Sequence, residues 1–381
     1  MRYLLIILCF ALVLSGCAAR PEEPPASAAT ETAPKAAVLP TTVPETQPPD
    51  PIRELLDTLS SEEKVGQLFL ARCNTETALK DIASYHLGGF VLFAADFESQ
   101  TPDSMRQTLS GYQRSANIPL LLAVDEEGGT VTRISRYTAF RDERFPSPRS
   151  AYKSGGMTGA LENEQNKCDL LKSLGLNVNI GPVCDLADDP DGFMYSRSLG
   201  QTPETTGEFV AWTVGIMDQN GIGSVLKHFP GYGNNADTHV GIAVDSRSLE
   251  ELEERDLVPF AYGIHAGCGA ILVGHTILEC LDSERPASLS PAVHTYLRED
   301  MGYTGVILTD DLVMEAITDL YGAGEAAVMA VQAGNDLLCS TDYATQYDAV
   351  LAAVADGRIS QQTLDAAAYR VLKWKMELGL L

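Results

Sequence analysis

The stretch Gly223-Ser224-Val225-Leu226-Lys227-His228-Phe229-Pro230-Gly231 contains the unit from which the fold is built. A short apolar run ends in a cation and an imidazole, and then opens into a glycine-rich loop. Comparable apolar runs recur along the chain, each followed by a polar or glycine-rich turn and a helical stretch. Eight such runs are present, at residues 68–71, 89–93, 120–124, 178–183, 223–226, 270–273, 305–308 and 335–339.

Between these runs lie amphipathic segments, for example 204–220, 249–265 and 292–301, and a long regular segment, 361–378, ends the pattern. Near-continuous apolar strands that alternate with helices indicate parallel pairing with right-handed crossovers. Eight units predict a closed (β/α)8 TIM barrel, a single catalytic domain of the α/β class, better than an open doubly wound sheet. The pair Gly128-Gly129 is not the glycine pattern of a dinucleotide-binding fold.

The N-terminal segment is predicted to lie outside this domain. A basic Met1-Arg2 and an apolar run from Tyr3 to Leu14 are typical of a signal peptide, and Leu14-Ser15-Gly16-Cys17 resembles a bacterial lipobox. We therefore expect a signal over residues 1–16, a lipidated Cys17 with a disordered Pro/Ala/Thr/Glu-rich tether over 17–51, and the barrel over 52–381. An ordinary signal peptide with a chance cysteine is the alternative. Either reading predicts an extracytoplasmic protein, and the lipobox predicts attachment to a bacterial membrane.

The composition limits the possible partners. A net charge of −25 repels phosphate backbones, so nucleic acid is not expected as a partner. The same charge disfavours docking of the protein on anionic lipid. Membrane contact is therefore expected through the lipid anchor alone, and the protein is expected to be a monomer. Neither a metal nor a cofactor is expected, because the histidines and cysteines lack ligand spacing. A disulfide bond is possible, but the spacing indicates no pair. Most of the six cysteines after Cys17 are expected to be buried thiols; the six are Cys73, Cys168, Cys184, Cys268, Cys280 and Cys339.

Charged side chains follow several of the predicted strands at their carboxyl ends. In a barrel these ends meet at one mouth, where active sites are built. Singly, each residue could be a helix cap or a satisfied polar group, but together they indicate a catalytic site. The set comprises Asp125-Glu126-Glu127, Asp185, Tyr195-Ser196-Arg197-Ser198, Lys227-His228, Gly274-His275 and Asp310-Asp311.

Four segments carry a family resemblance. Val124–Arg133, Tyr195–Gly200, Lys227–His239 and Gly305–Met314 resemble, in this order, the motifs of glycoside hydrolase family 3, and in particular its β-N-acetylhexosaminidases of peptidoglycan recycling and turnover. The resemblance extends from about Leu55 to the C-terminus.

The resemblance implies roles for individual residues. Asp310 would be the nucleophile of a retaining mechanism, and His239 would be the acid/base, paired with Asp237. Residues two apart in an extended loop face the same side, so Asp237 and His239 can meet. The hydroxyl and N-acetyl groups of the sugar would be held by Asp125, Arg133, Arg197, Lys227 and His228.

One further observation favours the N-acetylglucosaminidase branch. The family's β-glucosidases usually take their acid/base carboxylate from a second domain, whereas the residues after Asp310 are expected to be needed to finish the barrel. We therefore expect an enzyme, a retaining exo-β-N-acetylglucosaminidase that acts on peptidoglycan-derived glycans. A β-glucosidase or another exo-glycosidase of the family, a catalytically inactive glycan-binding lipoprotein, and a phosphorolytic enzyme remain as alternatives.

The loop after residue 229 departs from the family pattern. Tyr232 stands where the family usually has a histidine, Thr238 replaces a serine, and the loop is one residue shorter. Tyr232 is expected to pack the loop rather than take part in catalysis. For His275 a structural role is favoured over a contact with the sugar.

Overall fold

The computed structural model describes residues 50–233, 235 and 241–381, and the compact unit in which they lie spans Pro49–Leu381. Within these residues, eight parallel strands form one sheet in the order β10-β7-β5-β4-β3-β2-β1-β11. Each of the eight strands overlaps one of the eight apolar runs of the sequence, although the bounds differ, most at 178–183 and 335–339. Their bounds are β1 Phe69–Arg72, β2 Gly89–Leu92, β3 Leu121–Val124, β4 Val178–Asn179, β5 Gly223–Phe229, β7 Ala270–Val273, β10 Val306–Thr309 and β11 Leu338–Ser340.

The two end strands of this order close the sheet into a barrel. A parallel bridge joins Leu308 of β10 to Leu337, the residue before β11. The carbonyl oxygen of Ile307 accepts from the backbone N–H groups of Asp336, at 2.8 Å, and of Leu337, at 3.1 Å. The predicted (β/α)8 fold is therefore confirmed.

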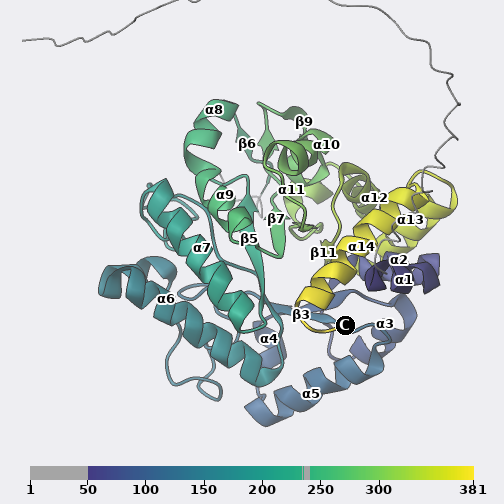
Figure 1. Ribbon diagram of the computed structural model, residues 1–381, viewed down its shortest axis with the longest axis horizontal. Helices are drawn as coiled ribbons and strands as arrows, with labels where there is room; N and C mark the ends of the chain where they lie inside the picture. Colours follow the sequence, from purple (N-terminus) through teal and green to yellow (C-terminus); the bar gives the residue numbers. More distant parts are fainter. Residues whose placement is uncertain (1–49, 234, 236–240) are drawn as a thin grey trace, which may run out of the picture. The chain divides into compact units, whose positions relative to one another are not determined.

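Helices surround the strands, as Figure 1 shows. Helix α14, in yellow, lies beside α1 and α2, in purple, so the last helix packs against the first two. The bounds are α1 Pro51–Thr58, α2 Ser61–Gln67, α3 Ala78–Tyr85, α4 Ala94–Phe97, α5 Pro102–Ser115, α6 Pro148–Leu174, α7 Pro203–Gln219, α8 Leu249–Glu251, α9 Val258–His265, α10 Pro291–Thr295, α11 Glu315–Thr318, α12 Ala323–Ala333, α13 Tyr343–Ala355 and α14 Gln361–Glu377. In the part of the chain covered by the structure, no helix is both long and apolar enough to cross a membrane.

Alternate residues of strands such as β3 belong to two different apolar clusters. Leu121 and Ala123 of β3 pack in a cluster made mostly of strand residues, whereas Leu122 and Val124 pack in a cluster made mostly of residues from the surrounding helices and loops. This division follows from the period of two along a strand. Both faces of the sheet are therefore buried, which explains why the strands read as continuous apolar runs.

Two of the expected helices are interrupted. The segment predicted at 249–265 consists of α8, a π-helical turn at Leu252–Asp256 and α9, and a second π-helical turn, Tyr296–Asp300, follows α10. In the first turn the Leu257 N–H donates to the carbonyl of Leu252 at 2.8 Å. Pro259 then lies in the first turn of α9, where its missing N–H costs no helical hydrogen bond. A small separate sheet consists of β6 Val244–Asp245, β8 Ile277–Leu278 and β9 Asp282–Pro286.

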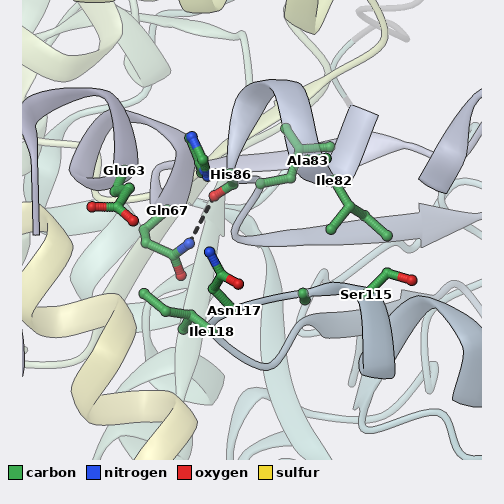
Figure 2. Close-up of a pocket in the computed structure, with 10 residues that line it drawn as sticks. Glu63, Gln67, Ile82, Ala83, His86, Ser115, Asn117 and Ile118 are labelled. Carbon is green, nitrogen blue, oxygen red and sulfur yellow. Dashed lines mark hydrogen bonds between the residues drawn. The ribbon is translucent and has the colours of Figure 1, made fainter. Parts of the chain in front are cut away.

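A small cavity of about 140 Å³ lies at the amino ends of β1, β2 and β3 (Figure 2). Gln67 lines it, and its Nε2 donates to the carbonyl oxygen of His86 at 2.8 Å. Residues that precede strands line this cavity, so it lies on the face of the barrel that serves stability.

Candidate active site

A cavity of about 560 Å³ lies at the carboxyl ends of the strands. Six of the eight residues predicted for catalysis or substrate binding line it together: Asp125, Arg133, Arg197, Lys227, His228 and Asp310. The other two, Asp237 and His239, lie outside the described residues, as does the predicted lipidation site, Cys17. The structure therefore brings the predicted sugar-binding residues and the predicted nucleophile to one site.

A buried ion network forms the floor of this cavity. Lys227, at the end of β5, is 2% exposed, and its Nζ lies 2.5 Å from Asp125 Oδ1 and 2.6 Å from Glu127 Oε1. Arg197 grips the same Glu127 with two bonds, Nε to Oε2 at 2.9 Å and Nη2 to Oε1 at 2.7 Å. Such a bidentate pair fixes the guanidinium in one orientation.

Opposite charges favour the ionised forms of Glu127 and Lys227 in this network. Burial opposes the charge on Glu127, but Lys227 and Arg197 outweigh it and hold the pKa of Glu127 below its usual range. Burial likewise disfavours the charge on Lys227, but Asp125 and Glu127 raise its pKa above the ordinary value. Three elements far apart in the sequence are thereby held together by charge.

His228 is held in one tautomer by two neighbours. Its Nδ1 lies 2.8 Å from Oδ2 of the buried Asp185, and its Nε2 lies 3.2 Å from Arg197 Nη2. Because a guanidinium can only donate, Nε2 is the acceptor and Nδ1 carries the proton. Burial opposes ionisation of Asp185, but the contacts with His228 lower its pKa. The other Asp185 oxygen, Oδ1, accepts from the backbone N–H of Tyr232 at 2.7 Å.

Asp310 follows β10 and is placed by the backbone. Its N–H donates to the carbonyl of Val273 in β7 at 3.1 Å, and its Oδ1 accepts from the N–H of Asp311 at 2.9 Å. Asp311 in turn accepts from the Thr341 hydroxyl at 2.5 Å. The end of β10 is therefore tied to β7 and to the segment after β11, which gives a rigid base for a nucleophile.

The start of the glycine-rich loop is packed rather than open. Tyr232 is 3% exposed, and its ring centroid lies 5.1 Å from that of His228 and 5.7 Å from that of Phe193. The expectation that Tyr232 packs the loop is confirmed. His275 is fully buried, with Nδ1 2.7 Å from the Ser288 hydroxyl and Nε2 3.0 Å from the Asp311 carbonyl, in agreement with the structural role that was favoured.

Arg247 joins the chain before the loop to the chain after it. Its Nη2 donates to the carbonyl of Gly231 at 3.2 Å and to Asp245 Oδ2 at 2.5 Å, while its Nη1 lies 2.6 Å from Asp256 Oδ2. The side chains of Asp245 and Asp256 are almost fully buried. The segment that contains Asp237 and His239 therefore starts and ends at a fixed ionic cluster.

No specific role is predicted from the sequence for two carboxylates of the site, Glu127 and Asp185. Glu127 and Asp185 occupy strand ends in the sequence pattern, yet nothing there indicates that one bridges Arg197 to Lys227 and the other orients His228. Their position just after predicted strands was the feature of the sequence that pointed to the active site. Asp125 and Arg133 are paired more loosely, at 3.8 Å between Oδ2 and Nη2.

The cysteines behave largely as expected. Those in the described residues are free thiols, and only Cys280 among them is partly exposed. Burial raises the pKa of Cys73 and of Cys168 to about 12. Within the same residues, no group of three or more His, Cys, Asp or Glu side chains is placed to hold a metal ion.

Comparison with known proteins identifies the family. A model described as the glycosyl hydrolase family 3 N-terminal domain matches residues 60–374. The chain belongs to glycoside hydrolase family 3. It is 30% identical over 331 residues to the β-hexosaminidase LpqI of Mycobacterium tuberculosis, covering 83% of each chain. The predicted enzyme class, a glycoside hydrolase of the β-N-acetylhexosaminidase type, is thereby confirmed.

Solved structures agree with this assignment. The chain superposes on a family 3 β-N-acetylglucosaminidase from Paenibacillus sp. str. FPU-7 with a TM-score of 0.79 and 32% identity, covering 85% of this chain and 63% of that one. It also matches β-hexosaminidase A of Pseudoalteromonas piscicida at 30% identity, covering 78% of this chain and 54% of that enzyme. The chain thus spans only part of these two relatives, and their activities as whole proteins enter below as a proposal.

Proposed function

We propose that the protein is a retaining exo-β-N-acetylglucosaminidase that hydrolyses terminal β-linked GlcNAc from peptidoglycan-derived glycans. The observation that carries the proposal is the shared cavity, in which Asp310 accompanies the ion network of Asp125, Glu127, Arg197 and Lys227. Fixed cations and carboxylates at this density suit the vicinal hydroxyls of one sugar ring. The relationship to β-hexosaminidases supports GlcNAc as that sugar.

In the proposed reaction, Asp310 attacks the anomeric carbon while His239 gives its proton to the leaving oxygen. The bond to the leaving sugar breaks, and a glycosyl ester with Asp310 forms. His239, now neutral, then takes a proton from a water molecule that attacks the same carbon and releases Asp310. Asp237 would favour the protonated state of His239 before the first step.

The remaining residues would position the sugar. Lys227 and both oxygens of Asp125 can form hydrogen bonds with neighbouring hydroxyl groups of the sugar. Asp185 and Arg197 fix the tautomer of His228 and the orientation of its ring. A pre-organised set of this kind lowers the entropic part of the barrier. Arg133 lines the same cavity.

The test of the nucleophile is Asp310→Ala, which should abolish turnover of an aryl β-GlcNAc while the protein stays folded. Undiminished activity would refute the assignment. An aryl glucoside assayed in parallel separates a β-glucosidase, and product stereochemistry followed by NMR tests retention. Sugar binding without turnover by the wild type would instead support a glycan-binding protein, and sugar 1-phosphate formed in phosphate buffer would support phosphorolysis.

The acid/base role of His239 is tested by substituents on the leaving group. His239→Ala should lower kcat more on a disaccharide than on an activated aryl glycoside, because a good leaving group needs no proton. An equal loss on both would argue against acid catalysis.

We also propose that the mature protein is a monomer held on the outer side of a bacterial membrane by lipid on Cys17. The support is the lipobox-like Leu14-Ser15-Gly16-Cys17 and the tether-like composition that follows it. Cys17→Ala should release the protein from the membrane fraction and abolish incorporation of labelled fatty acid. Retention of the label would disprove the anchor site.

A further inference from the structure

Arg72 is a cation of the cavity to which the site described above gives no role. It is the last residue of β1, it is solvent-exposed, and it lines the cavity together with Phe93 from the end of β2. Its guanidinium carbon lies 4.2 Å from the centroid of the Phe93 ring. Arg133 approaches the same ring, at 5.4 Å. We name Arg72, Phe93 and Arg133 the Arg72 subsite.

The charges of the Arg72 subsite are poorly compensated, unlike those of the floor. Within the described residues, Arg72 makes no ion pair with a carboxylate. Arg133 has one loose pair, with Asp125 at 3.8 Å, and its buried Nε has no hydrogen-bond partner. Asp96 interacts with Arg72 through its charge but forms no ion pair with it. Its Oδ2 instead accepts a hydrogen bond from the backbone N–H of Phe93 at 2.7 Å. Arg72 is therefore left without an ion pair in the described part of the chain, and Arg133 keeps only its loose pair with Asp125.

The stacking on Phe93 gives these cations a defined place. A guanidinium over an aromatic face keeps its edge donors available for a planar anion, and a carboxylate matches this geometry with two parallel bonds. An ammonium or a hydroxyl group of the substrate would gain nothing comparable from such a pair.

The overall charge makes these cations more significant. With a net charge of −25, the protein repels anions at long range. An acidic substrate would therefore depend on local cations at the mouth of the site, whereas a neutral glycan would not need them.

We propose that the Arg72 subsite binds a carboxylate of the substrate glycan. The proposal rests on the function proposed above, in which the terminal sugar removed is neutral GlcNAc, so the carboxylate belongs to the sugar that leaves. Among the peptidoglycan-derived glycans of the proposed function, this is the carboxylate of an N-acetylmuramic acid that follows the terminal GlcNAc, and the new element is the role of Arg72 in binding it.

The experiment compares two substrates that differ only in this charge. The β-1,4-linked disaccharide of GlcNAc and N-acetylmuramic acid and its methyl ester are hydrolysed by the wild type, Arg72→Gln and a control, Arg136→Gln. Arg136 is an exposed arginine stacked on Tyr137, at 5.7 Å, and does not line the cavity. The measured quantity is the ratio of kcat/KM for the acid to kcat/KM for the ester.

We expect the wild type to prefer the acid, and Arg72→Gln to lower the ratio by about tenfold, which is the loss of one charged hydrogen bond at an exposed site. Arg136→Gln should keep the wild-type ratio. Arg72→Lys, which keeps the charge but not the planar pair of donors, should fall between the two. Melting temperatures of all variants verify that each is folded.

Two results would overturn the proposal and can be told apart. If the wild type hydrolyses an aryl β-GlcNAc but shows no preference for the acid, or if Arg72→Gln keeps the preference, the Arg72 subsite is refuted and the proposed function stands. If the wild type hydrolyses neither the aryl glycoside nor either disaccharide, the proposed function fails and the subsite falls with it.

Discussion

Replacing Glu127 by glutamine tests the ion network on which the candidate site depends. Glu127 Oε1 accepts from Lys227 Nζ and Arg197 Nη2, and Oε2 accepts from Arg197 Nε. A glutamine keeps the shape and one accepting oxygen. Its NH₂ group, however, must point at one of the cations, and the network loses a negative charge that two buried cations share.

The expected loss in the free energy of unfolding follows from these contacts. Removing one partner of a buried ion pair costs about 3–5 kcal/mol, and the retained oxygen places Glu127→Gln near the lower end, at about 3 kcal/mol. Activity should fall as well, because Arg197 and Lys227 lose the group that fixes them. A displacement of about 1 Å in such groups lowers kcat/KM by about 100-fold.

Urea unfolding, followed by circular dichroism, measures the first effect, and hydrolysis of an aryl β-GlcNAc measures the second. Glu143→Gln is the control, since Glu143 is exposed and outside the cavity lining. We expect the unfolding midpoint of Glu127→Gln to fall with an unchanged slope, and the control to match the wild type. A Glu127→Gln protein as stable as the control would refute the reasoning that this carboxylate holds the site together.

Three further substitutions test other parts of the structure. Asp185→Asn turns a donor toward either His228 or the Tyr232 N–H, so we expect a loss of stability of about 2 kcal/mol and a lower kcat/KM; unchanged kinetics would show that the orientation of His228 is unimportant. Burial lowers the pKa of Lys375 from 10.5 to about 7. The unfolded chain thus binds more protons between these values, and stability rises with pH across that window. Lys375→Met should remove this rise and stabilise the protein below pH 7 by at most about 5 kcal/mol, as measured by urea unfolding at several pH values; an identical pH profile in both proteins would contradict the lowered pKa. Finally, a Cβ on Gly269 would lie 2.0 Å from the indole nitrogen of Trp374, so Gly269→Ala should lower the melting temperature, whereas Gly155→Ala, with open space around it, should not.

The barrel could be predicted because its strands are buried on both faces. Each strand therefore appears as an unbroken apolar run, such as residues 120–124, and the eight runs suffice to indicate a closed parallel barrel. The π-helical turns at Leu252–Asp256 and Tyr296–Asp300 could not be predicted, because one extra residue in a helical turn leaves the amphipathic pattern nearly unchanged.

The candidate site was predicted in part for a related reason. The carboxyl end of each strand points to the mouth of the barrel, which brought Asp125, Lys227 and Asp310 to one cavity without knowledge of any distance. Which carboxylate bonds to which cation depends on the loops between strands and on rotamers. The contact of Arg72 with Phe93 therefore became visible only in the structure.

The contacts of Arg247 affect how much the segment between Gly231 and Asp245 can vary in length. Since its guanidinium fastens Gly231 on one side and Asp245 on the other, the two ends of the segment are fixed by an ionic cluster and not by the segment's own length. Lengthening a loop between fixed ends adds little entropic cost. A segment of different length should therefore join the same two anchors if it keeps Tyr232 packed on His228, and the melting temperature of such a chimera should stay near that of the wild type.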